Sequence, residues 1–128
     1  MMLVNPMVLQ NRTREVRPVA CHKATRGLAS WYGARDHGKR MANGKPFNMY
    51  ALTAASRVLP LGARIQVTNI RTGQRVAVQV TDRGPYVRGR AIDLSYEAAR
   101  RIGMIGRGVE WVIIEQELMP GGWADNVL

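Results

Sequence analysis

The sequence has few of the residues that hold a fold together through disulfides or metal ions. It contains one cysteine, Cys21, and two histidines, His22 and His37, among 128 residues. A single cysteine excludes a framework of intramolecular disulfides and a zinc site made of several thiolates. With so few sulfur and nitrogen ligands, we expect neither a metal ion nor another cofactor.

Long apolar runs are also absent, because no segment approaches the roughly 18 apolar residues of a membrane span. The residues before Cys21 include Arg12, Arg14, Glu15 and Arg17 and have no apolar centre, so they make a poor signal peptide. An alanine precedes Cys21, which makes this cysteine only a weak candidate for lipidation. The residues themselves therefore do not indicate export.

Acidic residues are scarce, since nine Asp and Glu face 19 Lys and Arg for a net charge of +10. Such a charge attracts anionic partners in general. The basic residues are scattered, however, with no dense block and no aromatic platform for single strands. We therefore do not expect a nucleic-acid partner, although measured binding to duplex DNA at physiological salt would support one.

The length fits a single domain. We expect this domain to be a monomer.

The apolar and polar residues predict a small, mostly β domain. The segments 63–70 and 74–81 alternate apolar and polar residues around the turn at Gly73, which predicts a hairpin. The other expected elements are a strand at 28–32, a long surface loop at 33–48, a helix within 93–104 capped by Ser95, and a last strand at 109–116. We expect a flexible arm at 1–26, a barrel domain at 27–117 and a tail at 118–128.

The stretch VTDRGPYVRGRAIDLS contains two of the few acidic residues, Asp82 and Asp93, among Arg83, Arg88 and Arg90. In one interpretation these aspartates are structural, with Asp82 accepting backbone hydrogen bonds in a turn and Asp93 bonding the backbone ahead of the helix. In the other they are acids that take part in a reaction. The second interpretation requires the arginines to point away from them, because a neighbouring cation lowers a carboxyl pKa.

Several motifs together resemble the rare lipoprotein A family. They are ASWYG at 29–33, DRGP at 82–85 and the pattern R-x-IDLS at 90–95, within a similarity that runs from about Gly27 to Glu115. The resemblance implies a six-stranded double-psi β-barrel with one or two short helices. It also implies a septal-ring type of lytic transglycosylase acting on peptidoglycan glycan strands, in the bacterial cell envelope or periplasm or secreted.

The resemblance also implies a site. In related double-psi barrels two aspartates and a small hydroxyl residue line one groove, and the matching residues here are Asp82, Asp93 and Ser30. A lytic transglycosylase needs one carboxyl group that first protonates the departing oxygen and then accepts a proton from the 6-hydroxyl of the sugar. We assign this role to Asp93, with Asp82 as the neighbour that raises its pKa. The expected substrate contacts are Ser30, Tyr32, Lys45, Asn48, Ser56, Arg83, Tyr86 and Arg90.

The sequence departs from the family at three positions. Where the family usually has two acidic residues and a histidine, this chain has Lys45, Asn48 and Ser56. None of these replaces a carboxyl or imidazole in proton transfer. Two interpretations therefore stay open: a transglycosylase in which these residues bind glycan, and an expansin-like barrel that binds glycan without cleaving it. Trp31 and Phe47 are further stacking candidates, and we expect Trp31 or Tyr32 to be buried and Trp111 to lie in the core.

Overall fold

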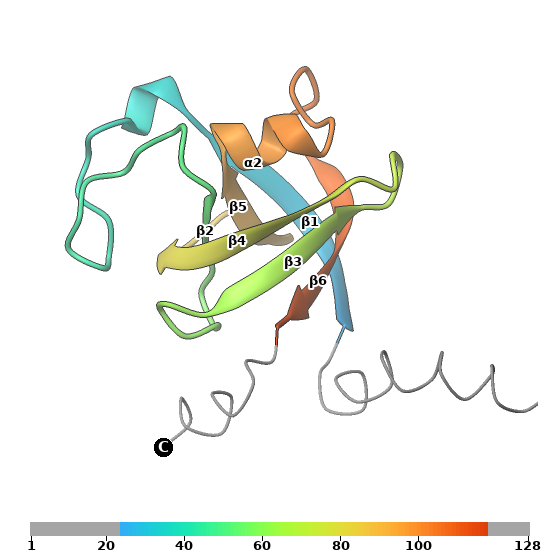
Figure 1. Cartoon of the computed structure of the whole chain (residues 1–128), viewed down its shortest axis with the longest axis horizontal. Coiled ribbons are helices and arrows are strands. Elements are labelled where there is room, and N and C mark those ends of the chain that lie inside the picture. Colours follow the sequence, from blue (N-terminus) through green and yellow to red (C-terminus); the bar gives the residue numbers. More distant parts are fainter. Residues whose placement is uncertain (1–23, 118–128) are drawn as a thin grey trace, which may run out of the picture. The chain divides into compact units, whose positions relative to one another are not determined.

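The computed structural model describes residues 24–117, in which six strands close into a barrel (Figure 1). The strands are β1 (Ala24–Tyr32), β2 (Thr53–Ala55), β3 (Arg64–Asn69), β4 (Arg75–Asp82), β5 (Arg90–Ser95) and β6 (Glu110–Gln116). The helical elements are a 3-10 turn, η1 (Ala34–Asp36), and a short helix, α2 (Tyr96–Arg101). The predicted fold class, a six-stranded barrel with one or two short helices, is thus confirmed.

The strands follow one another around the barrel in the order β1-β5-β2-β4-β3-β6. Two pairs are parallel, β1 with β5 and β2 with β4, and the other four are antiparallel. Closure pairs every strand on both sides, so no sheet edge is left open. This order also brings the ends of β4 and β5 to either side of the short strand β2.

The predicted hairpin is confirmed as β3 and β4. Ile65 pairs with Val78 and Val67 with Val76, and all four side chains are buried. The intervening residues Gln66 and Ala77 face outward, as the period of two in a strand requires. Gly73 in the connecting turn has a φ of 76°, a conformation that favours glycine.

Helix α2 is short and begins directly after its predicted cap. Ser95 caps it as expected, because its hydroxyl accepts a hydrogen bond from the Ala98 amide at 3.2 Å. Asp93 and Leu94, which precede the cap, lie in β5 and pair with Ser30 and Trp31 of β1. None of the helices within residues 24–117 has the length and apolarity needed to cross a membrane.

The first strand starts at Ala24, ahead of the boundary at Gly27 that the sequence suggested. Ala24 to Arg26 pair with Glu115 to Ile113 of β6, which places these three residues in the barrel wall. The rest of the predicted arm, with Cys21, and the tail at 118–128 lie outside the described residues.

Two expectations about aromatic burial were wrong. Trp111 is 48% exposed, because it lies between the buried residues Glu110 and Val112 of β6 and so faces outward, where the Arg26 guanidinium lies 4.9 Å from its ring centre. Trp31 and Tyr32 are both only half-buried. Trp31 packs against the core from outside, and its indole nitrogen donates to the Arg107 carbonyl at 3.2 Å.

Two register shifts interrupt the parallel pairs. One lies between Leu28 and Ala29 of β1 and the other between Ala54 and Ala55 of β2. Beside the first shift, β1 and β5 approach so closely that a Cβ added to Gly27 would lie 2.7 Å from the Cβ of Ala91. Glycine at position 27 therefore permits the close contact that fixes the register of these two strands.

We predict that Gly27→Ala lowers the free energy of unfolding by about 1–3 kcal/mol, because the new methyl group must push β1 away from β5. Equilibrium unfolding in urea measures this change. Gly108→Ala is the matched control, since nothing lies within 4 Å of its added Cβ, and it should leave stability unchanged or slightly raised. Equal stability of the two variants would contradict the close-contact account.

Candidate functional site

Four residues on four adjacent strands form one row across the outside of the barrel. Ser30 of β1 pairs with Asp93 of β5, Asp93 pairs with Ala55 of β2, and Ala55 pairs with Asp82 of β4. Adjacent strands lie about 4.8 Å apart, so the backbones that carry the two aspartates are separated by about 10 Å. Ala55 contributes only a methyl group, which leaves room between the two carboxylates.

The alternation of the strands sets the direction of this row. Asp93 lies between Ile92 and Leu94, whose side chains are fully buried in the core, so its carboxylate is directed to the opposite face. Asp82 reaches the row because the register shift pairs Ala54 with Val80 but Ala55 with Asp82, passing over Thr81. The shift is thus what brings Asp82 to the level of Asp93.

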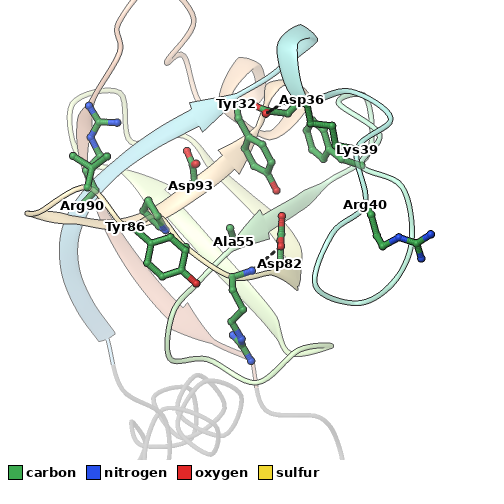
Figure 2. Close-up of a pocket in the computed structure, with 14 residues that line it drawn as sticks. Tyr32, Asp36, Lys39, Arg40, Ala55, Asp82, Tyr86, Arg90 and Asp93 are labelled. Carbon is green, nitrogen blue, oxygen red and sulfur yellow. Dashed lines mark hydrogen bonds and ion pairs between the residues drawn. The ribbon is translucent and has the colours of Figure 1, made fainter.

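Asp93, Ala55 and Asp82 of this row line a pocket of about 350 Å³, within the size range of ligand sites, roughly 300–1,000 Å³. Figure 2 shows the two aspartates and Tyr32 around its centre, with Arg90 and Arg40 towards opposite sides. The walls come from the loop after β1, from the end of β4 and from the segment before β5. The lining residues are Tyr32, Asp36, Lys39, Arg40, Phe47, Ala55, Asp82, Arg83, Gly84, Pro85, Tyr86, Val87, Arg90 and Asp93.

Asp93 is half-buried, and its carboxyl is held by Ser30. The Ser30 hydroxyl donates to Oδ1 of Asp93 at 2.9 Å. Burial raises the pKa of Asp93 above its ordinary value of 3.8, and the negative charges of Asp36 and Asp82 raise it further. The hydrogen bond from Ser30 and the charge of Arg90 lower this pKa but do not cancel the rise. Asp93 therefore holds its proton to a higher pH than an ordinary aspartate does.

Asp82 has both a structural and a pocket-facing position. Its Oδ1 accepts hydrogen bonds from the backbone amides of Ala42 at 2.9 Å and Arg83 at 2.8 Å. The first bond ties the loop after β1 to the end of β4, and the second stabilises the DRGP turn, as the structural interpretation predicted. The same side chain also lines the pocket opposite Asp93, so the two interpretations of Asp82 are compatible.

The arginines of the turn do not pair with the aspartates. The Arg83 guanidinium donates to the carbonyls of Ser56 at 2.7 Å and Leu59 at 2.6 Å, on the outer side of the turn. Arg57 donates to the carbonyls of Pro85 and Arg90 and so holds the next segment in place. Both cations support the pocket wall through backbone groups. Arg83 thereby meets the condition of the acid interpretation, whereas the charge of Arg90 still lowers the pKa of Asp93.

The loop between β1 and β2 covers one side of the row. The rings of Tyr32 and Phe47 are stacked at a centroid distance of 4.2 Å and an angle of 12°. Burial, together with the charges of Asp82, Asp93 and Asp36, raises the pKa of Tyr32 well above its usual value of 10. Tyr32 therefore stays protonated throughout the physiological range. Tyr86 is 78% exposed at the other side of the pocket, where its ring face is open to a ligand.

The structure brings together most of the predicted site residues. Asp82, Asp93, Tyr32, Arg83, Tyr86 and Arg90 line the pocket, and Ser30 supports Asp93 from beneath. The trio that departs from the family pattern does not line it. Lys45 and Asn48 are exposed on the loop, where the Asn48 side chain accepts a bond from the Tyr50 amide, and Ser56 is buried with its hydroxyl accepting from the amides of Val58 and Leu59.

The sequence analysis missed the charged residues that the loop contributes. Asp36, Lys39 and Arg40 line the pocket, and Asp36 forms an ion pair with Lys39 at 3.5 Å. The length of the loop could have pointed to them, because a long connection without regular structure in a small domain is commonly functional. Within residues 24–117, no group of three acidic, histidine or cysteine side chains is placed to hold a metal ion.

Comparison with known proteins agrees with this architecture. Residues 24–113 match a double-psi β-barrel family described as lytic transglycolase. The chain belongs to this family. It is 56% identical over 89 residues to the "Probable endolytic peptidoglycan transglycosylase RlpA" of Synechocystis, covering 70% of this chain and 28% of that protein. It is 42% identical over 112 residues to the "Endolytic peptidoglycan transglycosylase RlpA" of Campylobacter jejuni, covering 88% of this chain and 41% of that protein. The chain thus spans less than half of each of these RlpA relatives.

Solved structures show the same barrel. The apo expansin of Clavibacter michiganensis matches with a TM-score of 0.61 and 25% identity, over 77% of this chain and 52% of that one. The Streptomyces papain inhibitor matches with a TM-score of 0.57 and 21% identity, over 73% of this chain and 94% of that one. The second match shows only a shared fold, and proteins of such different names indicate that the barrel alone does not set the function.

We predict that Asp93→Asn is more stable than the wild type at pH 7. The folded protein raises the pKa of Asp93, so it binds a proton more tightly than the unfolded chain does, and stability falls as pH rises from 3.8 through the folded pKa. Asparagine keeps an oxygen that accepts from Ser30 and removes the buried charge.

Urea unfolding at a series of pH values measures the difference. The advantage of Asp93→Asn should shrink as the pH falls through the folded pKa and be absent below 3.8. A variant that is less stable than the wild type at pH 7 would show instead that the ionised carboxylate anchors the fold.

Proposed function

We propose that this domain is a lytic transglycosylase that cleaves peptidoglycan glycan strands, with Asp93 acting first as general acid and then as general base. The observation that carries the proposal is a half-buried carboxyl of raised pKa, bonded to Ser30 and lying across Ala55 from a second carboxylate in one pocket. Family membership and the names of the RlpA relatives support it.

The reaction needs few protein groups. Protonated Asp93 donates its proton to the glycosidic oxygen while the bond from that oxygen to C1 of N-acetylmuramic acid breaks. The 6-hydroxyl of the same sugar attacks C1 and closes a 1,6-anhydro ring, and its proton passes to the Asp93 carboxylate. No water is consumed, and Asp93 ends the cycle protonated. The negative charge of Asp82 across the pocket favours the positive character that develops at C1.

The walls of the pocket suit an anionic polysaccharide. Lys39, Arg40 and Arg90 line it, and N-acetylmuramic acid carries a lactyl carboxylate. Tyr86 offers an exposed ring on which a sugar can stack. Peptidoglycan lies in the bacterial cell envelope, so we place the protein in the envelope or outside the cell. We still expect the protein to be a monomer and to bind no nucleic acid.

A second candidate is a glycan-binding barrel without turnover. Lys45, Asn48 and Ser56 replace ionisable residues of the family, and the barrel is similar to that of an expansin. Because the three side chains lie outside the pocket lining, their replacement leaves the Ser30, Asp93 and Asp82 row intact. This arrangement favours the enzyme over the binder.

We predict that the wild-type domain releases 1,6-anhydromuramyl products from glycan strands freed of stem peptides, and that Asp93→Asn lowers the rate by about 10²–10⁴-fold. Mass spectrometry of the digest measures both. Glu117→Gln is the control, because it also removes one negative charge but lies outside the pocket, in a surface pair with Arg64, and it should cleave at the wild-type rate.

Three outcomes would change the assignment. Products with free reducing ends would identify a hydrolase. Unchanged cleavage by Asp93→Asn would remove this residue from the mechanism. If the wild type and Asp93→Asn both sediment with cell-wall sacculi and release nothing, the domain is the binder.

A further inference from the structure

The hydroxyl of Tyr32 is a buried polar group that the fold does not use. It has essentially no solvent-accessible area and no hydrogen-bond partner among the described residues. A buried hydroxyl left without a partner costs about 1–3 kcal/mol, so most such groups in proteins are satisfied. Thr53 Oγ1 is the other such group within residues 24–117, but only Tyr32 lines the pocket, where a ligand that displaces the covering atoms can supply the missing partner.

The Tyr32 ring is fixed in this position. It stacks on Phe47, which is itself only 2% exposed and lies on the loop that closes over the row. Asp82 holds the same loop through the Ala42 amide. Figure 2 shows the Tyr32 ring extending from the end of β1 into the pocket, with its hydroxyl directed toward the side that carries Asp82. The stack keeps the ring in place, so only the atoms that cover the hydroxyl must move when a ligand meets it.

The charges around Tyr32 restrict the kind of ligand atom that it can meet. Asp82, Asp93 and Asp36 act together with burial to raise the pKa of Tyr32, so the hydroxyl stays protonated and is a donor. The negative charges of Asp82 and Asp36 repel an anionic acceptor, so a lactyl carboxylate would be placed better beside Lys39, Arg40 or Arg90. The acceptor at Tyr32 is therefore a neutral oxygen.

Among the neutral oxygens of a glycan strand, the carbonyl of an acetamido group is a strong acceptor that needs no donor in return. Its methyl group also needs an apolar surface, which Val87, 52% exposed, provides in the pocket lining, while Phe47 and Ala55 add only small exposed edges. A sugar hydroxyl can also accept the hydrogen bond from Tyr32, but it has no methyl group to place on the apolar surface.

We propose that Tyr32 determines specificity for N-acetylated sugars by donating its hydroxyl to the acetamido carbonyl of one sugar in the pocket. The inference rests on the proposed function only in taking a glycan as the ligand, and it holds equally for a transglycosylase and for a binder. It gives Tyr32 a role in sugar selection that is separate from proton transfer by Asp93.

The test compares two neutral hexamers with the same β-1,4 linkage, one of N-acetylglucosamine and one of glucose, by isothermal titration calorimetry. We expect the wild type to bind the N-acetylated hexamer at least 10-fold more tightly. Tyr32→Phe keeps the ring stack and removes the donor, so it should weaken binding of the N-acetylated hexamer by about 5–15-fold, the value of one hydrogen bond, and leave binding of the glucose hexamer unchanged.

Stability provides a readout that separates ligand binding from support of the fold. Tyr32→Phe should unfold in urea at the same or a higher concentration than the wild type, because it removes a buried group without a partner. Tyr50→Phe is the matched control, since Tyr50 is 64% exposed and lies outside the pocket lining, and it should alter neither binding nor stability.

Two results would overturn the inference. One is a wild type that binds the two hexamers equally well, or a Tyr32→Phe variant that binds the N-acetylated hexamer as tightly as the wild type does. The other is a Tyr32→Phe variant that is clearly less stable, which would show that the hydroxyl supports the fold, for example through Asp82. Failure of the proposed function is a separate result. If the protein releases no anhydro products but still prefers the N-acetylated hexamer in a way that depends on Tyr32, the transglycosylase proposal is wrong and the specificity proposal stands.

Discussion

The site depends on the register shift between β2 and β4. Because the pairing passes over Thr81, Asp82 comes level with Ala55, and Ala55 is also paired with Asp93. Two carboxylates thereby face one pocket across a single methyl group. An unshifted pair would place Thr81 opposite Ala55 instead. The second shift, between β1 and β5, sets Ser30 opposite Asp93 and depends on the close contact at Gly27. Both shifts adjoin the pocket, where β-bulges commonly redirect side chains.

This geometry explains how a strongly basic protein raises the pKa of one carboxyl group. Cations that would lower the pKa of Asp93 are occupied elsewhere, since Arg83 and Arg57 bind backbone carbonyls of the surrounding turns. Burial and two neighbouring aspartates then outweigh Arg90 and the Ser30 hydroxyl. The basic residues that line the pocket still attract an anionic polymer through their charge, so long-range attraction and a raised carboxyl pKa coexist in one small domain.

Much of the fold was predictable, because strand alternation and motif spacing report local structure. The hairpin of β3 and β4, the cap at Ser95 and the shared pocket of Asp82 and Asp93 were all expected. The direction of side chains beyond the motifs was not. Trp111 faces outward because of its place in the alternation of β6, and Ser56 is buried because two amides bind its hydroxyl. Asp36, Lys39 and Arg40 reach the pocket through a loop whose path no periodic pattern encodes.

The central claim is that the barrel holds the carboxyl of Asp93 in a state favoured to carry a proton. A direct measurement is the pH titration of its carboxyl carbon by NMR in the wild-type domain, with the resonance assigned by its loss in Asp93→Asn. The account predicts a midpoint above 3.8, the ordinary value for aspartate, and a further rise in Ser30→Ala as the hydrogen bond that lowers it is removed. A midpoint at or below 3.8 would show that Asp93 is an ordinary ionised carboxylate and would contradict the account.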